Sequence, residues 1–438
     1  MKNKMKSLKK IGNFLFIKEL IIIAICAFIG VAALGITFLI PNSYMRDNAI
    51  ESSVFLRNEG TYPHIWEGGS GERWLDYYTD GLMLNVAYTT TENRTKDVLL
   101  DTHVYVDEQN PMISIYEVLG LSSNDYEVQT YGRYWHGYII ILRPLMCFFA
   151  YQDIYQINMI FQLALVFAFV YILAKSTDKI LIIPFFGMYV FLSPISLFGC
   201  LQFSVCFYIM MFALIALFLL KKYLNDTTRN YLFLLTGIAT AYFDLLTYPL
   251  ITLGVPLIAY LWLDCKNLTS GDGILNGERD KGFLYLLYTV SWGVGYGGMW
   301  ASKWLIASII TEENIISNAL GAIKMRSDFY RQYSYFETLK LNFRFCNIQI
   351  YSLALICMAV FIIVLKIKKH LILNKKLIPC MCAILSVTIY PFIWYLFTQN
   401  HSMLHYWFTY REMAISVFGI FMIGVIIIKM PNRESRNE

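Results

Sequence analysis

The stretch QNHSMLHYWFTYRE, residues 399–412, holds two of the six histidines, His401 and His405, followed closely by Arg411. Histidines four apart share one face of a helix, a spacing that zinc sites use. Ser402, however, stands where a zinc-protease motif has glutamate, and no cysteine or carboxylate lies between the histidines. Two other interpretations stay open: anchoring of a helix at a membrane interface, or hydrogen bonding of an anionic or sugar ligand. For the ligand, Arg411 would form a two-bond contact to phosphate.

A second pattern lies in GERWLDYYTDGLMLNVAYT, where Glu72, Asp76 and Asp80 are spaced i, i+4, i+8. On a helix these carboxylates would form one acidic stripe. Burial side by side would raise a carboxyl pKa, as an acid or base requires. The alternative is a helix start, where carboxylates favour the helix dipole and Arg73 supplies a salt partner. We nominate Asp76 and Asp80 as catalytic and Glu72 as substrate-binding.

Further polar residues occur beside aromatic or apolar segments. Lys303 and Trp304 lie in GMWASKWLIAS, where snorkelling of the lysine to lipid headgroups is the alternative to ligand binding. Asp244, in AYFDLLTYP, is expected to join a helix pair or line a ligand site. Arg133 and His136, in GRYWHGY, are expected where sugar rings or lipid phosphates pass. All five are candidate substrate-binding residues.

The composition defines the class of protein that must position these residues. Hydrophobic residues make up 57% and charged residues 15% of the chain, against roughly 45–50% and 25% in soluble domains. We predict an all-α polytopic membrane protein. The net charge of +5 does not indicate a nucleic-acid partner, because the basic residues cluster in short loops. The nine cysteines lie in or beside apolar segments, so no disulfide framework is expected.

Apolar segments of membrane-spanning length predict about ten transmembrane helices. The first covers about 20–40, and the others lie at about 155–174, 180–198, 201–220, 231–247, 249–264, 283–305, 348–366, 377–398 and 412–429. The chain therefore divides into a cytoplasmic N-terminus with the first helix (1–40), a large first extracytoplasmic loop with interfacial helices (41–153), and a helical bundle (154–438) with an outer loop at about 306–347.

Positive charge sets the orientation. The N-terminus, the C-terminal tail and alternate loops hold 22 of the 36 Lys and Arg residues, so we predict that both termini are cytoplasmic. Residues 41–137, with fifteen Asp and Glu against six Lys and Arg, are then outside. The segment 134–149 fits this topology as an amphipathic helix at the outer interface rather than as a span. The candidate residues all converge on the outer side.

The layout resembles the GT-C superfamily of integral-membrane glycosyltransferases. The segments LDYYTDGLML, RYWHGY, LLTYPLITLGVPL, GMWASKW and NHSMLHYWFTYR together look like a bacterial branch similar to glucosyltransferases that decorate surface polysaccharide. The resemblance implies a GT-C-like fold in the bacterial plasma membrane. It also implies sugar transfer from a polyprenyl-phosphate donor to a cell-surface glycan or lipid-linked acceptor outside. A carboxylate would deprotonate the acceptor hydroxyl, and cationic groups would stabilise the departing phosphate.

One feature departs from that family. GT-C enzymes usually carry an aspartate pair shortly after the first span, where this chain has only Asp47. Either Asp47 or the pair Asp76 and Asp80 is therefore the catalytic carboxylate. No cofactor is predicted, and a need for a divalent metal is left open.

Two other functions remain as alternatives. A transporter or flippase predicts inverted repeats and a polar path at the bilayer midplane, and the sequence has neither feature. A non-catalytic scaffold of cell-envelope assembly also stays open. In every case membrane lipids are partners.

Overall fold

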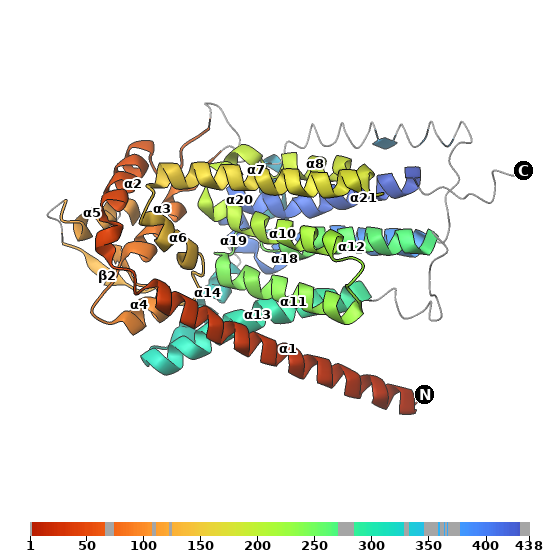
Figure 1. The fold of residues 1–438 in the computed structure, drawn as a ribbon, viewed down its shortest axis with the longest axis horizontal. Coiled ribbons are helices and arrows are strands. Elements are labelled where there is room, and N and C mark those ends of the chain that lie inside the picture. Colours follow the sequence, from red (N-terminus) through yellow and green to blue (C-terminus); the bar gives the residue numbers. More distant parts are fainter. Residues whose placement is uncertain are drawn as a thin grey trace, which may run out of the picture.

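A computed structural model describes residues 2–65, 74–106, 111–121, 125–269, 284–327, 333–345 and 377–429, with a few residues between 358 and 366. Long helices run side by side as a bundle, and the short elements between α1 and α7 gather at one end of it (Figure 1). We call these short elements the cap. The drawn chain begins, and α21 ends, at the end of the bundle opposite the cap (Figure 1). The side of a membrane on which each end lies stays a prediction.

The bundle contains the long helices of the described chain and several shorter ones packed with them. Their bounds are α1 Lys2–Thr37, α7 Tyr151–Lys175, η3 Lys179–Leu181, α8 Ile182–Phe191, α9 Pro194–Phe198, α10 Leu201–Leu219, α11 Asp226–Phe243, α12 Ile251–Thr269, α13 Leu284–Thr311, α14 Ile315–Arg326, α15 Tyr335–Phe345, α17 Ile378–Thr388, α18 Tyr390–Phe397, α19 Gln399–Leu404, α20 Tyr406–Thr409, η7 Tyr410–Met413 and α21 Ala414–Lys429.

Within the described residues, five segments are long and apolar enough to cross a membrane. They are Phe16–Thr37, Tyr151–Lys175, Leu201–Leu219, Ile378–Phe397 and Tyr406–Ile428. This confirms a mostly helical chain with the character of a membrane protein. The total of about ten spans stays a prediction, and the expected span at 348–366 lies almost entirely outside the described residues.

The sequence predicts helix breaks at LSPISLFG (192–199) and LTYPL (246–250), and both are present. Helix α8 ends at Phe191, and Pro194 starts α9 after Ser193, which has a left-handed φ of 58°. Helix α11 ends at Phe243, and α12 begins at Ile251. Proline lacks the amide hydrogen that a helix interior needs, so it favours such interruptions.

The cap contains η1 Asn42–Tyr44, α2 Arg46–Glu59, α3 Tyr77–Tyr88, α4 Arg94–Leu100, β1 His103–Tyr105, α5 Pro111–Val118, β2 Glu127–Gln129 and α6 Ile139–Met146. Strands β1 and β2 are antiparallel, with Val104 opposite Val128. Helix α6 falls within the predicted interfacial segment 134–149 and has eight residues, too few to span a bilayer.

A buried arginine ties the cap to the first helix. The Arg143 guanidinium donates to the carbonyl of Ala87 at 2.6 Å, the carbonyl of Ile40 at 2.6 Å and the side-chain oxygen of Asn42 at 2.7 Å. These contacts join α6 to the end of α3 and to the chain leaving α1. Charge-assisted hydrogen bonds of this kind are stronger than neutral ones, so Arg143 holds the cap in place.

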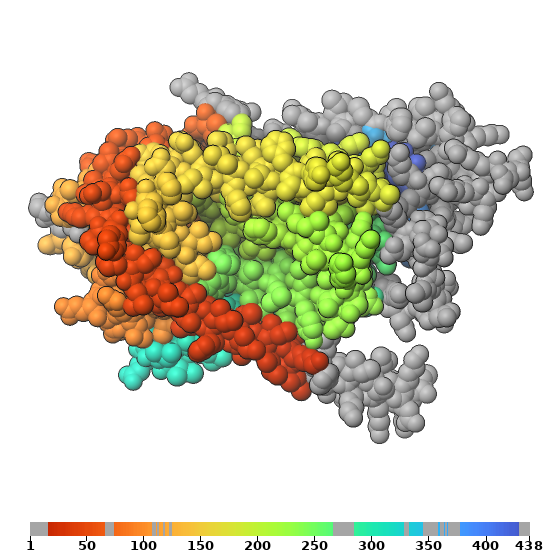
Figure 2. All heavy atoms as spheres, in the orientation of Figure 1, coloured from red at the N-terminus to blue at the C-terminus, as the bar shows by residue number. Residues whose placement is uncertain are grey.

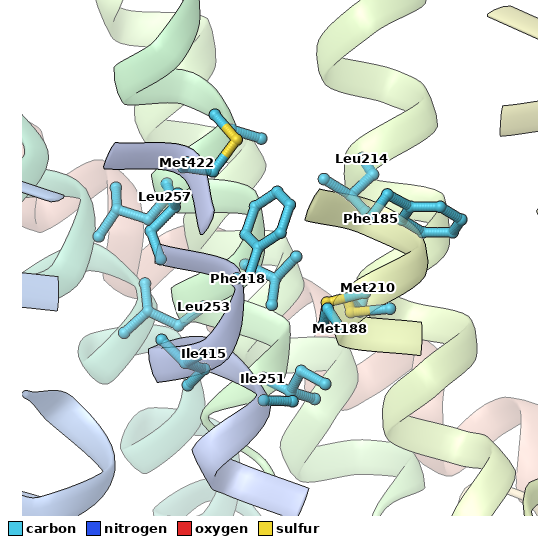
Figure 3. Close-up of a cluster of buried hydrophobic side chains, with 14 of the residues drawn as sticks. Phe185, Met188, Met210, Leu214, Ile251, Leu253, Leu257, Ile415, Phe418 and Met422 are labelled. Carbon is cyan, nitrogen blue, oxygen red and sulfur yellow. The ribbon is translucent and has the colours of Figure 1, made fainter. Parts of the chain in front are cut away.

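The bundle core is formed by apolar side chains from α8, α10, α12 and α21. Figure 3 shows them gathered between these helices, including Met188, Met210, Leu257 and Phe418, each 3% exposed or less. Burying one such side chain contributes roughly 1.5–3 kcal/mol. The core therefore holds together segments that are more than 200 residues apart in the sequence.

Large apolar side chains also cover the outside of the bundle. Phe28 and Ile36 on α1 are 75% and 68% exposed, and Phe167 on α7 is 69% exposed. Figure 2 shows α1 and α7 running along one face of the molecule, away from the cap. Such broad apolar surface is unfavourable in water and is typical of helices that contact lipid.

A disulfide was not expected from the sequence. Cys265 of α12 and Cys380 of α17 are bonded, with their Cα atoms 6.2 Å apart. The two cysteines are 115 residues apart in the chain, and only the packing of α12 beside α17 brings them together. The expectation that the cysteines form no disulfide framework is therefore corrected at this pair.

Helices α11 and α13 approach closely at two glycines. A Cβ atom at Gly237 would overlap the main-chain carbonyl of Trp292, and one at Gly295 would overlap that of Leu234.

We expect Gly237→Ala to lower the free energy of unfolding by about 1–3 kcal/mol, because the backbones must separate. Thermal unfolding of the purified protein in detergent measures this. Gly293→Ala is the matched control, since nothing lies within 4 Å of a Cβ there; equal losses in both variants would contradict the close-contact explanation.

Candidate functional site

Asp76 is positioned by a turn of the chain in the cap that brings the segment before α3 back against Thr61 and Pro63. The amide of Leu75 donates to the carbonyl of Pro63, and the amide of Tyr78 donates to that of Thr61. Asp76 itself is the N-cap of α3, accepting from the Thr79 amide at 2.9 Å. Aspartate is favoured there because its oxygen satisfies a free amide of the first turn.

This geometry corrects the predicted acidic stripe. Helix α3 begins at Tyr77, so Asp76 precedes the helix rather than lying on its face. Glu72 lies outside the described residues. The alternative noted from the sequence, a carboxylate at a helix start, describes Asp76, because capping by a short acidic side chain competes with continuation of the helix toward the N-terminus.

The Asp80 carboxylate is buried, and both of its oxygens accept hydrogen bonds from the protein. Its carboxylate accepts from the Tyr151 hydroxyl at 2.5 Å and from the amides of Leu201 and Gln202 at 2.7 and 2.9 Å. Burial raises the pKa of Asp80 to about 6, against these hydrogen bonds. The two amides are at the start of α10, where a carboxylate satisfies unpaired donors. This arrangement favours a structural role for Asp80, joining the cap to the bundle.

The Asp76 carboxylate accepts fewer hydrogen bonds than the Asp80 carboxylate. Among the described residues, its second oxygen has a long contact, 3.4 Å, from the indole nitrogen of Trp407. Burial raises the pKa of Asp76 above its usual value near 3.8. The Trp407 ring lies 5.5 Å from that of Tyr62 and 5.3 Å from that of His405. The cap carboxylate thus meets the C-terminal histidine motif, and we call Asp76, Tyr62, His405 and Trp407 the Asp76 cluster.

The two histidines of that motif differ in their contacts. His401 bonds through Nε2 to the carbonyl of Leu246 at 2.8 Å, and since a carbonyl only accepts, this nitrogen carries the proton. His405 stacks beside it, with ring centroids 4.8 Å apart. Its Nδ1 is buried and has no hydrogen-bond partner among the described residues. Burial lowers the pKa of His405 to about 4, so the ring is neutral at pH 7.

Asp244 supports His401 indirectly. Its carboxylate accepts from the Thr247 amide at 2.9 Å and from the Thr247 hydroxyl at 2.5 Å. This closes the turn that contains Leu246, which has a left-handed φ of 65°. The carbonyl of Leu246 is thereby presented to His401. Asp244 therefore supports the histidine motif through this turn and is not part of the Asp76 cluster.

Arg411 is enclosed by the bundle. Its Nε donates to the carbonyl of Leu192 at 3.0 Å, and another guanidinium nitrogen donates to that of Trp407 at 3.1 Å. The guanidinium also lies 4.3 Å from the ring centre of Phe203, and the residue is 0% exposed. These contacts position Trp407. The remaining guanidinium nitrogen has no hydrogen-bond partner among the described residues, and the phosphate contact expected from the sequence stays a prediction.

A different arginine, Arg326, lies near the histidines. Its guanidinium donates to the Tyr134 hydroxyl at 2.9 Å, and its charge helps to lower the pKa values of His401 and His405. The amide of Asn400 donates to the main chain beside it, at Met325, joining α14 to α19. Sequence reasoning missed Arg326, although a basic residue in a predicted outer loop is a usable signal.

A second group of polar side chains lies deeper in the cap. Lys303 of α13 and Asp101 form an ion pair of 2.7 Å in which both side chains are 0% exposed. The Lys303 ammonium also lies 5.5 Å from the Trp135 ring centre. Lys303 and His103 both help to lower the pKa of His136, after burial, which is the main cause. We call Asp101, His103, His136 and Lys303 the Asp101 cluster; Asp101 and His103 were not nominated from the sequence.

Arg133, Trp304 and Asp47 were also expected to bind substrate or to act in catalysis. Arg133 lies over the Tyr131 ring at 4.3 Å, and the Trp304 indole donates to the Arg133 carbonyl at 2.9 Å. Both therefore border the Asp101 cluster. The side chain of Asp47 is exposed in the first turn of α2 and makes no hydrogen bond or ion pair with the described residues. Its placement gives no support to a catalytic role.

Across the part of the chain that the structure describes, no group of three or more His, Cys, Asp or Glu side chains is arranged to hold a metal ion. No protein-family model matches the chain, and no curated protein or solved structure is significantly similar to it.

Proposed function

We propose that the protein transfers a sugar from a polyprenyl-phosphate donor to a hydroxyl of a cell-surface glycan or lipid-linked acceptor, on the outer side of the membrane. The observation that carries the proposal is the meeting of Asp76, from the cap, with His405 and Trp407, from the C-terminal motif. These residues are more than 300 positions apart in the chain. They combine a carboxylate, an unpaired imidazole nitrogen and aromatic rings at the cap end of a lipid-facing bundle.

Each group has a role in the proposed reaction. The Asp76 carboxylate takes the proton of the acceptor hydroxyl, and that oxygen attacks the anomeric carbon of the donor sugar. The bond from this carbon to the phosphate oxygen breaks, and its electron pair stays on the phosphate. Arg326 stabilises the added negative charge. Tyr62 and Trp407 offer flat apolar faces to the sugar ring.

The raised pKa of Asp76 suits a base. A carboxylate with its usual pKa is a weak proton acceptor at neutral pH, and burial moves the Asp76 pKa toward the working pH. A neutral His405 can accept or donate one hydrogen bond through its unpaired Nδ1. His405 therefore helps to orient the substrate and adds no charge to the site.

A transfer assay tests the proposal directly. Purified protein in detergent is incubated with polyprenyl-phosphate glucose, made with a labelled sugar, and with surface glycan extracted from a deletion strain. We expect label to move from the lipid to the glycan. Label that stays on the lipid with every polyprenyl-phosphate sugar and every extracted glycan tried would contradict the proposal and favour a scaffold or transporter.

Arg326→Lys is expected to weaken donor binding although it keeps the charge. A planar guanidinium forms two parallel hydrogen bonds with phosphate, which a lysine ammonium cannot reproduce. Losing a charge-assisted hydrogen bond costs about 1.5–3 kcal/mol, roughly ten- to a hundredfold in affinity. Titration with a polyprenyl-phosphate sugar measures the dissociation constant.

Lys324→Arg provides a control in the same turn of α14, because Lys324 is exposed there. It is expected to leave the affinity unchanged. An unchanged dissociation constant in both Arg326→Lys and Arg326→Gln would remove Arg326 from the donor site. A loss in Arg411→Lys alone, in correctly folded protein, would return the phosphate contact to Arg411.

A further inference from the structure

The Asp101 cluster contains three buried polar atoms without hydrogen-bond partners among the described residues. They are Oδ1 of Asp101, Nε2 of His136 and Nδ1 of His103. Asp101 and His136 are 0% and 1% exposed. Folded proteins leave few buried polar groups unpaired, because each one loses its hydrogen bonds to water. Three such atoms in one cluster indicate a hydrogen-bonding partner that is not among the described residues.

The other atoms of these side chains are held firmly. The second oxygen of Asp101 accepts from Lys303 at 2.7 Å. His136 bonds through Nδ1 to the Tyr138 hydroxyl at 2.7 Å. Asp101 and His136 also have left-handed φ angles of 53° and 49°, which non-glycine residues adopt uncommonly. Oδ1 of Asp101 and Nε2 of His136 thus belong to side chains that are already held in place.

The four residues of the cluster carry no net positive charge that would attract an anion, although Arg133 borders them. Lys303 is neutralised by Asp101, and burial lowers the pKa values of His103 and His136, so both imidazoles are neutral. A phosphate or carboxylate would meet the unpaired oxygen of Asp101 and be repelled. A hydroxyl instead donates to that oxygen and can donate to or accept from a neutral imidazole nitrogen.

Aromatic rings border the same cluster. The ring of Tyr131 lies 5.3 Å from that of His136, and the ring of Tyr134 lies 5.9 Å from it. Trp300 packs against Tyr134 at 5.2 Å. A few fixed polar atoms surrounded by aromatic side chains are the usual lining of a site for a small ligand that has both polar and apolar faces.

We infer that the Asp101 cluster binds an uncharged, hydroxyl-rich sugar ring, through hydroxyls bonded to Asp101, His103 and His136. This inference rests on the proposed function for its place in the reaction, where the ring belongs to the acceptor. The acceptor is then a neutral glycan rather than an acidic one. Binding of a sugar at the cluster is nevertheless measurable without any transfer.

The test uses the purified full-length protein in detergent, with thermal unfolding and tryptophan fluorescence as readouts. The probes are methyl glucoside, methyl galactoside and methyl N-acetylglucosaminide, with glucuronate and inorganic phosphate as charged comparisons. We expect at least one neutral glycoside to raise the unfolding temperature saturably, since a ligand that binds the folded state stabilises it. Failure of all three neutral probes, or tighter binding of a charged one, would overturn the inference.

Variants locate the binding. Asp101→Asn combined with Lys303→Met removes both members of the ion pair, so that no buried charge is left alone, and asparagine tolerates the left-handed φ. We expect about tenfold weaker glycoside binding, the loss that follows removal of a hydrogen bond to a charged acceptor. His103→Phe, which keeps an aromatic ring and removes both ring nitrogens, is expected to weaken binding also. Unchanged affinity in both variants would place the sugar elsewhere.

Asp97 provides a matched control in the same part of the cap. It is a buried carboxylate, but both its oxygens are used, by the amide and hydroxyl of Thr91 and by the hydroxyl of Thr102. Asp97→Asn is expected to keep the wild-type affinity for the glycoside. Asp76→Asn is expected to bind the glycoside and lose transfer, so failure of the proposed function and failure of this inference give different results.

Discussion

Asp76→Asn is expected to lower sugar transfer by about 10²- to 10⁴-fold, the contribution typical of a positioned general base. Asparagine keeps an oxygen that can accept from the Thr79 amide, so α3 keeps its cap. The substitution is therefore expected to lower the rate of transfer and to leave folding unchanged. The labelled-sugar assay measures the rate, and circular dichroism with thermal unfolding verifies the fold.

Asp80→Asn is the paired comparison. Both oxygens of Asp80 accept from main-chain amides, so an asparagine must turn its own N–H donors toward one of them. We expect a loss of about 1–3 kcal/mol in unfolding free energy, with transfer retained in the folded fraction. Normal transfer by Asp76→Asn would eliminate the proposed base, and loss of chemistry in well-folded Asp80→Asn would transfer that role to Asp80.

The pH dependence follows from the same carboxyl. Burial raises the Asp76 pKa, and a base works only when deprotonated. Activity is therefore expected to fall, as the pH is lowered, at a pH above that of an ordinary aspartate. A pH–rate profile for the wild type measures this. An acid limb at or below pH 3.8, the usual aspartate pKa, would contradict a buried base.

Lys303→Met is expected to lower the free energy of unfolding by about 3–5 kcal/mol, because it leaves the buried Asp101 charge without a partner. Burial already raises the Asp101 pKa to about 7, and Lys303 is what opposes that rise. In the variant the folded-state pKa goes higher still, further above that of the unfolded chain. Stability then falls as the pH rises between these two pKa values, so the loss is smallest at low pH.

Unfolding of wild type and variant across pH 4–8 in detergent measures this loss. The double variant Asp101→Asn with Lys303→Met is expected to recover most of the stability, because it removes both charges. An equal loss in the single and double variants, with no dependence on pH, would show that packing of the Lys303 stem matters and that the ion pair does not.

The class of protein and most helix positions follow from local sequence patterns. A run of about twenty apolar residues has few ways to satisfy its backbone hydrogen bonds other than as a helix. The breaks at Ser193 and before Ile251 were also readable, because proline interrupts a helix locally. The sequence likewise indicated that Asp76, His405 and Lys303 lie at polar positions next to apolar segments. All of these depend on interactions between residues near one another in the chain.

Which polar residues meet depends on how distant helices pack together. Asp76 and Asp80 look alike in sequence, yet one contacts Trp407 and the other is occupied by the first amides of α10. Arg411 is enclosed by carbonyls of the bundle, whereas Arg326 lies beside the histidines. The partner of a buried charge comes from whichever distant helix packs against it, and that choice depends on side-chain shape across the whole core, which a local pattern does not record.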